Sequence, residues 1–435
     1  MVEKNENLRK KLKEKYRELE EQFKPMGKEV STYTTPVNFK ESLNSPIHRW
    51  YGYKEGFSPS FVKYFITKYT TDDNSIIFDP FGGVGTTALE SIKLGYDAIS
   101  MDVSPLGVFA SKVKTRNYTS KDIFEKTKYV NILKRLENYP KKYIIENQTI
   151  AKYFDSETYE SLLKIRSFIL DIDIDTVQDL FLLALLSLID EISTHHKNGN
   201  GVKKKLHLPQ PLNFHELCEK IIEKLEVYLH DIQNTKIIGK ADIIQHSCIV
   251  PYSLSKKADI VLTSPPYANC FDYSKVYLSE LWIGNFFKER SDQERFRENS
   301  IASHVHYIWK RKEQSKGSET VNSIIIPILK AQKLWSNRIP EMLFRYFSDL
   351  DAFLHHLSKN LTNGAIVGIV VGNSVYGGVP ISVDTLLAEM AVDQGFQCLG
   401  IKVYRKVVAS SQQMILLDDE EKHYVRESLV ILRWK

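Results

Sequence analysis

The chain has 435 residues, of which 43% are hydrophobic and 26% are charged, and its formal net charge is +5. This length exceeds one ordinary domain, and the mild positive charge permits a polyanionic partner without requiring one. The four widely spaced cysteines argue against both a disulfide framework and a cysteine metal site, and no apolar run is long enough to span a bilayer. The composition predicts a soluble cytoplasmic protein.

The first predicted elements are two helices. Residues 3–23 carry apolar side chains at three- and four-residue steps, which predicts a charged helix docked by a narrow stripe, within an N-terminal unit at residues 1–30. Ser58-Pro59 is a typical helix start. The aromatic segment HRWYGYKEGF precedes this start, and its side chains either pack against the first strand or belong to a ligand site.

The next segment has the order strand, glycine turn, helix, strand. Residues 76–78 are apolar, DPFGGVGTT follows them, residues 88–94 favour a helix, and AISMD ends the unit. This order is half of a doubly wound α/β fold, and it belongs to a first core part at residues 31–116. Glycines at such a turn let a nucleotide-like ligand approach the backbone, although a tight connection without a ligand has the same pattern.

Two long segments interrupt the predicted core. Residues 117–235 are polar and helical in pattern and contain HHKNGNGVKKK, which predicts an exposed basic loop rather than a metal site. Residues 286–340 follow a second core part at 236–285 and contain SHVHYIWKRK. Cations with interleaved aromatic residues are suited to bind phosphates and unstacked bases. For each segment, the alternative to DNA contact is a solvated loop without a ligand. The candidate DNA contacts are Lys203, Lys204, His304, Tyr307, Lys310 and Arg311.

The core resumes at residues 341–435. GAIVGIVVGNS predicts a strand, and a helix follows over about residues 382–394. CLGIKVYRKV and RESLVILRWK predict two more strands, the last of them antiparallel at the edge of the sheet.

The stretch ADIVLTSPPYAN begins as a buried strand and ends in Ser264, Pro265, Pro266 and Tyr267. An exocyclic amino group on cytosine or adenine is a poor nucleophile because its lone pair is conjugated with the ring. The hydroxyl of Ser264 and the carbonyl of Pro265 are suited to accept hydrogen bonds from that NH2 group, and the two prolines hold both acceptors stiffly. Tyr267 offers a π-face for a base rotated out of its duplex.

DPFGGVGTT and TSPPY together resemble the S-adenosylmethionine-dependent amino-group DNA methyltransferases, most closely the N4-cytosine branch. The resemblance covers roughly residues 46–116, 236–282 and the strands from Gly364, with the cofactor turn before the catalytic loop. It implies an α/β fold with a doubly wound, mostly parallel sheet of seven strands and helical insertions. It implies S-adenosylmethionine as the cofactor, with its ribose at Asp102, its ammonium at Asp79 and its adenine near Phe81 or Asp242. The expected cofactor site also contains Gly82, Gly83, Gly85, Thr86 and His48, and Asn373 in VVGNS is expected beside the target base.

These patterns predict methyl transfer to N4 of cytosine at a specific site in double-stranded DNA, without a metal or membrane, with a cognate restriction endonuclease as an expected partner. N6-adenine methylation uses the same geometry, but Ser264 stands where aspartate or asparagine is more usual for adenine. An RNA amino-group methyltransferase and a noncatalytic DNA-binding relative are further alternatives. Cytosine C5 methylation is excluded, because no cysteine follows a proline.

Overall fold

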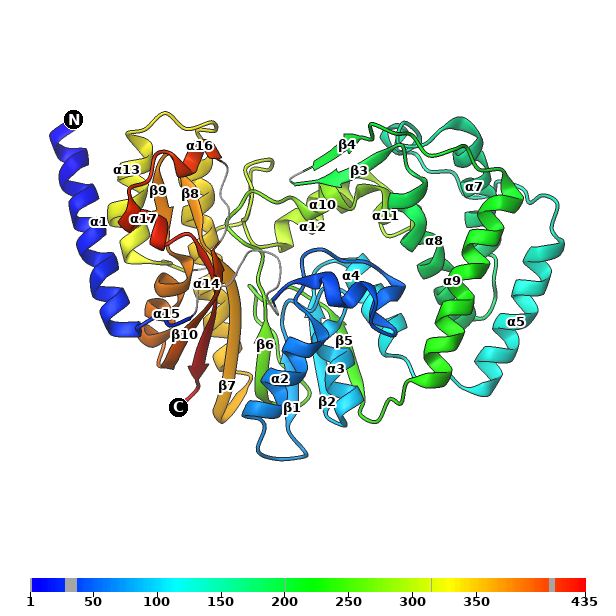
Figure 1. The fold of residues 1–435 in the computed structure, drawn as a ribbon, viewed down its shortest axis with the longest axis horizontal. Coiled ribbons are helices and arrows are strands. Elements are labelled where there is room, and N and C mark those ends of the chain that lie inside the picture. Colours follow the sequence, from blue (N-terminus) through cyan, green and yellow to red (C-terminus); the bar gives the residue numbers. More distant parts are fainter. Residues whose placement is uncertain (1, 28–36, 200, 314, 407–410) are drawn as a thin grey trace.

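One seven-stranded sheet forms the centre of the molecule, in the strand order β10-β11-β7-β6-β1-β2-β5 (Figure 1). The computed structural model describes residues 2–27, 37–199, 201–313, 315–406 and 411–435. The predicted boundary between residues 30 and 31 lies outside these residues. The strands of the sheet are β1 (Ile76–Asp79), β2 (Asp97–Asp102), β5 (Ala241–Gln245), β6 (Ala258–Thr263), β7 (Leu361–Gly372), β10 (Gln397–Lys406) and β11 (Arg426–Arg433).

The direction of the strands confirms the predicted doubly wound, mostly parallel sheet. β7, β6, β1, β2 and β5 pair in parallel, and β11 is antiparallel to both of its neighbours, β7 and β10. The predicted edge position of the last strand is wrong, because β11 lies between β7 and β10. Nearly all of its residues are buried, as an interior strand requires.

Alternating side chains of the sheet face two different helical layers. Phe78 belongs to a core that includes α1, α13, α14 and α15, whereas its neighbour Ile77 packs against α2 on the opposite face. The predicted docking of α1 is confirmed, since Leu12, Tyr16 and Leu19 are buried. The helices of the first layer are α1 (Val2–Phe23), α13 (Ile326–Lys330), α14 (Ile339–Ser358) and α15 (Val383–Asp393). The helices of the second layer are α2 (Pro59–Tyr69), α3 (Thr86–Leu94) and α4 (Pro105–Thr115).

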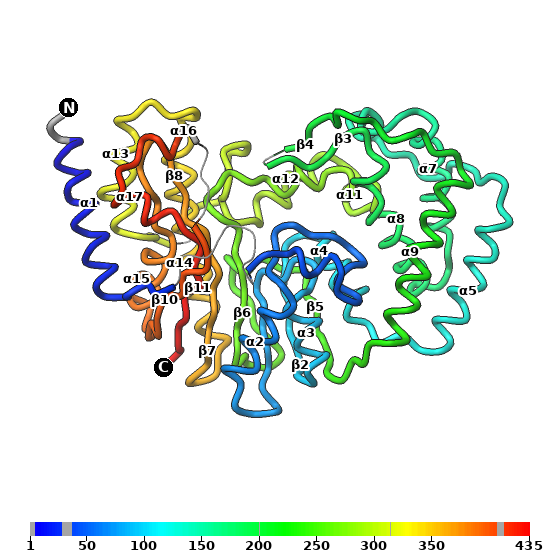
Figure 2. The backbone as a smooth tube through the Cα atoms, in the orientation of Figure 1, coloured from blue at the N-terminus to red at the C-terminus, as the bar shows by residue number. Residues whose placement is uncertain are grey.

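Residues 117–235 form mainly helices at the end of the molecule far from α1 (Figure 2). Their apolar side chains share one core with α3 and α4. Asp231 accepts hydrogen bonds from Arg49 and Trp50, so this unit also binds the segment that precedes α2. Its helices are α5 (Ser120–Arg135), α6 (Gln148–Ala151), α7 (Ser156–Leu170), α8 (Asp175–Ile192) and α9 (Phe214–Asn234).

The basic stretch between α8 and α9 is a β-hairpin, although the sequence predicts a loop. β3 (His195–Asn198) and β4 (Gly201–Lys204) pair antiparallel with His195 opposite Lys204. The paired backbone satisfies its own hydrogen bonds, which lets an otherwise polar segment extend from the helical unit. The hairpin projects toward the middle of the molecule, above the region where the sheet strands end (Figure 1).

The remaining elements are short and connect the layers. Within the described ranges, every helix is too short or too polar to traverse a bilayer. These elements are η1 (Phe39–Leu43), η2 (His48–Trp50), α10 (Tyr273–Val276), α11 (Leu278–Ile283), α12 (Arg290–Asn299), η3 (Val321–Ile325), β8 (Ser374–Tyr376), β9 (Val379–Ile381), α16 (Ser411–Met414) and α17 (Asp419–His423).

Candidate active site

Two neighbouring parallel strands, β1 and β6, carry the predicted motifs at their carboxyl ends. β1 leads into the glycine turn, and β6 leads into Ser264. Parallel neighbours end at the same edge of a sheet, which is where α/β folds bind their ligands. Gly83 of the turn and Ser264 line one common cavity, as the sequence predicts.

The glycine turn requires glycine at particular positions. Gly83 and Gly85 have φ angles of +49° and +82°, which L side chains rarely adopt. A Cβ atom at Gly85 would lie 2.2 Å from Oγ of Ser111 on α4, and one at Gly82 would collide with another serine. Thr86 then begins α3. The turn can therefore pack tightly against α4 while Gly83 borders the cavity.

Asp102 at the end of β2 binds the glycine turn directly. Its carboxylate accepts hydrogen bonds from the N–H groups of Gly83, at 2.8 Å, and Ser104, at 2.7 Å. Burial raises the pKa of Asp102, and these N–H groups oppose that shift. Each carboxylate oxygen has a second acceptor site, so the side chain can also accept hydrogen bonds from a ligand in the cavity that it lines.

Asp79 has a different position from the one predicted. Its carboxylate accepts hydrogen bonds from the hydroxyls of Thr263, at 2.6 Å, and Thr87, at 2.7 Å, and from the N–H of Phe81. Burial raises the pKa of Asp79 to about 6. Because both oxygens are bound within the protein, Asp79 ties β1 to β6 and α3 and does not line the cavity predicted to hold a ligand ammonium.

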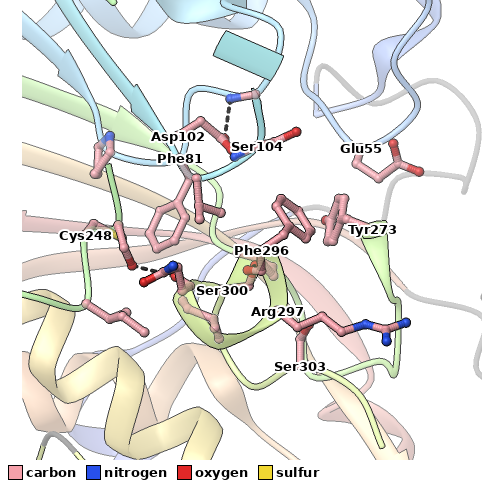
Figure 3. Close-up of a pocket in the computed structure, with 18 of the residues that line it drawn as sticks. Glu55, Phe81, Asp102, Ser104, Cys248, Tyr273, Phe296, Arg297, Ser300 and Ser303 are labelled. Carbon is pink, nitrogen blue, oxygen red and sulfur yellow. Dashed lines mark hydrogen bonds between the residues drawn. The ribbon is translucent and has the colours of Figure 1, made fainter. Parts of the chain in front are cut away.

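We call the space beside the turn the glycine-turn cavity (Figure 3). The space between its lining atoms, including the part open to solvent, is about 780 Å³. Asp102 and Ser104 border one side in the close-up, and Phe296, Arg297 and Ser300 border the opposite side. Its other lining residues are Tyr53, Glu55, Pro80, Phe81, Gly83, Val103, His246, Ser247, Cys248, Ile249, Ser264, Pro266, Asp272, Tyr273, Asn299, Ile301, Ser303 and His304.

Of the predicted cofactor residues, Phe81, Gly83 and Asp102 line this cavity, whereas Asp79, Gly82, Gly85, Thr86, His48 and Asp242 do not. His48 is buried, and its ring binds the carboxylate of Glu90 at 2.8 Å, whereas Tyr53 and Glu55 of the same segment reach the cavity. Asp242 is exposed on β5, the edge strand, and the residues at 246–249 line the cavity in its place. In these two segments, neighbours of the predicted residues border the cavity.

Ser264 has its hydroxyl hydrogen engaged and its lone pairs available. Its Oγ lies 3.1 Å from the carbonyl oxygen of Val370 on β7, to which it donates. Among the described residues, none donates a hydrogen bond to the carbonyl of Pro265. Both oxygens are therefore placed to accept hydrogen bonds, as expected for acceptors of an NH2 group.

A second space, the tyrosine cavity, meets the first at Ser264. The space between its lining atoms, including the part open to solvent, is about 1110 Å³, and Glu55, Ser264 and Tyr273 line both cavities. Tyr267 lines it and donates a hydrogen bond to Glu427, which in turn pairs with Arg405. A flat group in the tyrosine cavity would thus lie next to a ligand in the glycine-turn cavity.

Asn373 lines the tyrosine cavity, but its side-chain amide forms hydrogen bonds within the protein. The amide nitrogen donates to Asp384 and to the carbonyl of Tyr424, and the amide oxygen accepts from the N–H of Asp384. This arrangement differs from the predicted contact with a base, because the side chain already has internal partners for its donors and its acceptor.

The second predicted DNA-contacting group, at residues 304–311, packs against the protein. His304 is buried and lines the glycine-turn cavity, and Tyr307 donates a hydrogen bond to Glu298. The guanidinium of Arg311 pairs with the buried carboxylate of Asp349 at 2.6 Å. His304 is thus buried, and the partly buried Tyr307 and Arg311 bind acidic side chains of the protein, whereas Lys310 is well exposed.

The hairpin keeps its predicted cations on the surface. Lys203 and Lys204 are exposed, and no described residue forms an ion pair with either. On β3, Lys197 pairs with Glu280 and lies over the ring of Tyr277, whose hydroxyl donates to Glu55. The hairpin is therefore linked through Tyr277 to Glu55, which lines both cavities.

The glycine-turn cavity fits a nucleoside that carries a positive charge. Asp102 and Glu55 place carboxylates in its wall, and Phe81 and Val103 add apolar surface suited to a purine. S-adenosylmethionine combines a purine nucleoside with a sulfonium centre, and its ribose hydroxyls suit Asp102. Among the described residues, no group of three or more His, Cys, Asp or Glu side chains is arranged to hold a metal ion.

Comparison with known proteins agrees with this geometry. A family model described as DNA methylase matches residues 2–106. The Type II methyltransferase M.AvaI of Nostoc sp. is 26% identical over 396 residues, covering 83% of this chain and 81% of the relative. The Type II methyltransferase M.BsoBI of Geobacillus stearothermophilus is 26% identical over 459 residues, covering 89% and 85%.

One solved structure, the rRNA methyltransferase aviRa from Streptomyces viridochromogenes, aligns over 93% of this chain and 94% of its own, with a TM-score of 0.28 and 9% identity. The fold assignment rests instead on the strand order of the sheet. These matches support an amino-group DNA methyltransferase that uses S-adenosylmethionine.

Proposed function

We propose that this enzyme methylates N4 of cytosine at a specific sequence in duplex DNA, after the target base has rotated out of the helix. The observation that carries the proposal is the position of Ser264, whose acceptor oxygen lies where the glycine-turn cavity meets the tyrosine cavity. A base in the tyrosine cavity would present its amino group to this oxygen, beside the cofactor.

The reaction requires an amino nitrogen whose lone pair points at the methyl carbon. Hydrogen bonds from the NH2 group to Oγ of Ser264 and to the carbonyl of Pro265 would fix that direction. S-adenosylmethionine supplies the electrophilic methyl group. In the transfer, the amino nitrogen would form a bond to the methyl carbon as the sulfur–carbon bond breaks, and the nitrogen would release one proton to water. No covalent intermediate with the protein is needed.

The tyrosine cavity suits a base that has left the duplex. Tyr267 offers an aromatic face for stacking, and stacking of a base on such a ring contributes about 1–3 kcal/mol. The exposed Lys203 and Lys204 of the hairpin are suited to contact phosphates near the opening. A neutral hydroxyl at position 264, rather than a carboxylate or amide, favours cytosine over adenine as the target.

The curated relatives are Type II methyltransferases, which supports site-specific methylation and a role beside a restriction endonuclease with the same target. Expression in a host that lacks DNA methylation, followed by sequencing that maps modified bases, tests base and site together. We expect N4-methylcytosine at one recurring sequence. N6-methyladenine as the sole product contradicts the cytosine assignment, and preferential labelling of tRNA by the purified enzyme contradicts the DNA assignment.

A further inference from the structure

The tyrosine cavity contains a cation that the reaction described above does not use. Arg405 lies near the end of β10 and lines this cavity together with Ser264 and Tyr267. Its Nε atom is bound by the carboxylate of Glu427, and the side chain is 30% exposed. The guanidinium is thus anchored at one nitrogen and still accessible.

The two terminal nitrogens of Arg405 are available as donors. No described residue accepts a hydrogen bond from Nη1 or Nη2, while Nε is held by Glu427. An arginine fixed in this way presents its remaining N–H groups in a rigid, planar arrangement. The second cation of the cavity, Lys54, is solvent-exposed and lacks a comparable anchor among the described residues.

Three other polar side chains of the cavity have their donors engaged within the protein. The phenol of Tyr267 donates to Glu427, and the amide nitrogen of Asn373 donates to Asp384 and a carbonyl. Ser264 donates to the carbonyl of Val370. Arg405 therefore supplies anchored hydrogen-bond donors to a cavity whose serine supplies an acceptor.

A continuous series of contacts joins the acceptor to the donor. Oγ of Ser264 lies 3.4 Å from the hydroxyl of Tyr267, that hydroxyl lies 2.7 Å from Glu427, and Glu427 binds Arg405. The acceptor and the guanidinium are thus separated by one tyrosine and one carboxylate. Both groups line the tyrosine cavity, one as a hydrogen-bond acceptor and the other as a donor.

The Watson–Crick edge of cytosine has this arrangement of groups. The amino group at N4 is a donor, and N3 and O2 are acceptors. Adenine has a donor at N6 and an acceptor at N1, but it carries a C–H group where cytosine has O2. An enzyme reads a flipped base through hydrogen bonds to this edge, so a donor at the O2 end favours cytosine.

We propose that Arg405 determines the base specificity of the enzyme by donating hydrogen bonds to O2 of the target cytosine, with Glu427 holding its guanidinium in place. This role rests on the proposed N4-cytosine activity. Glu427 is then a positioning residue with two partners, because it orients both Arg405 and Tyr267.

The test compares two enzymes on two substrates. Wild type and Arg405→Met are assayed on duplexes whose target is cytosine or 2-thiocytosine, in which a weakly accepting sulfur replaces O2. We expect Arg405→Met to lower kcat/KM on cytosine roughly tenfold or more. We expect the sulfur substitution to lower wild-type kcat/KM roughly tenfold and to have less than about a twofold effect on Arg405→Met.

Two further variants make the result decisive. Arg405→Met leaves Glu427 without its cation, so Arg405→Met/Glu427→Gln repeats the test with a neutral side chain that can still accept from Tyr267. Arg433→Met changes an exposed arginine at the end of β11 and should respond to the sulfur substitution as wild type does.

An equal response of wild type and both Arg405 variants to the sulfur substitution overturns the proposal. In that case the Arg405 variants lose the same factor of kcat/KM on cytosine as on 2-thiocytosine. This result would point to a phosphate contact. Failure of the cytosine assignment itself is distinct, because wild type would then leave the target cytosine of both duplexes unmethylated and would produce N6-methyladenine.

Discussion

The phenol of Tyr267 donates a 2.7 Å hydrogen bond to the carboxylate of Glu427, which lies 160 residues later in the chain. Glu427 is on β11, the strand that separates β7 from β10. Since Glu427 also binds Arg405 of β10, the last two strands of the sheet fix the tyrosine of the catalytic loop. The antiparallel end of the fold thus has a direct part in shaping the tyrosine cavity.

The ring of Tyr267 and its hydroxyl can be separated by substitution. Tyr267→Ala removes the stacking face, so we expect single-turnover methylation to slow by the equivalent of about 1–3 kcal/mol, with unchanged affinity for S-adenosylmethionine. Tyr267→Phe keeps the face and loses the hydroxyl that contacts Glu427 and Ser264, so its rate should lie between wild type and Tyr267→Ala. Unchanged turnover in Tyr267→Ala would mean that the base binds elsewhere.

Asp102 should act mainly on the cofactor. It holds Gly83 and Ser104 and faces the glycine-turn cavity, so Asp102→Ala should weaken S-adenosylmethionine binding roughly ten- to a hundredfold, as measured by calorimetry. The control is Asp97→Ala, at the other end of β2 and outside the cavity lining. Equal cofactor affinity in Asp102→Ala and wild type would remove Asp102 from the cofactor site.

The hairpin lysines should contribute to the salt dependence of DNA binding. Each phosphate contact adds about 0.9 to the slope of log K against log salt, so Lys203→Ala/Lys204→Ala should reduce the slope by about 2. Lys121→Ala/Lys134→Ala removes two exposed lysines of α5, on the outer side of the helical unit, and should leave the slope unchanged. If the hairpin variant kept the wild-type slope, the exposed Lys310 would become the next candidate.

Asp384 should stabilise the fold at neutral pH. It is fully buried and pairs with Arg426, which is 2% exposed. Burial raises the pKa of Asp384, but Arg426 and the surrounding hydrogen bonds outweigh this and hold the pKa below its usual range. Breaking such a pair costs roughly 3–5 kcal/mol, so Asp384→Ala should lower the free energy of unfolding in urea by about that amount at pH 7.

The pH dependence of this effect has a definite sign. A depressed pKa stabilises the folded state above the unfolded pKa, about 3.9, and the contribution is lost as pH falls through the folded value. The difference between wild type and Asp384→Ala should be constant at pH 5–7 and shrink below about pH 4. Asp393→Ala, exposed on the same helix, should change stability by no more than about 0.5 kcal/mol. A difference that grows on acidification would contradict this reasoning.

The parts of the fold that depend on local pattern were predictable from the sequence. The sequence shows where two strands end, because the apolar residues 76–78 precede the glycine turn and another apolar segment precedes Ser264. A doubly wound sheet brings such strand ends together. The order of the last two strands was not predictable in this way, because apolar alternation in β11 identifies a strand but not its neighbours.

The site was predictable where sequence neighbours act together and not where partners are distant. Nothing near Arg311 in the sequence indicates that Asp349 binds it, and nothing near Tyr267 indicates Glu427. Basic and aromatic residues in a loop have the same pattern whether they contact DNA or buried acids. Residues 296–304 form one wall of the glycine-turn cavity. Their amino-acid composition does not differ from that of a solvent-exposed segment.

The acceptor role of Ser264 is tested most directly by its removal. Ser264→Ala deletes Oγ and leaves Asp102, Tyr267 and both cavities in place. In a single-turnover assay with saturating S-adenosylmethionine and target duplex, we predict methyl transfer about a hundredfold slower than wild type, with both dissociation constants unchanged within about twofold. A rate equal to that of wild type would contradict the assignment of Ser264 as the acceptor that orients the amino group.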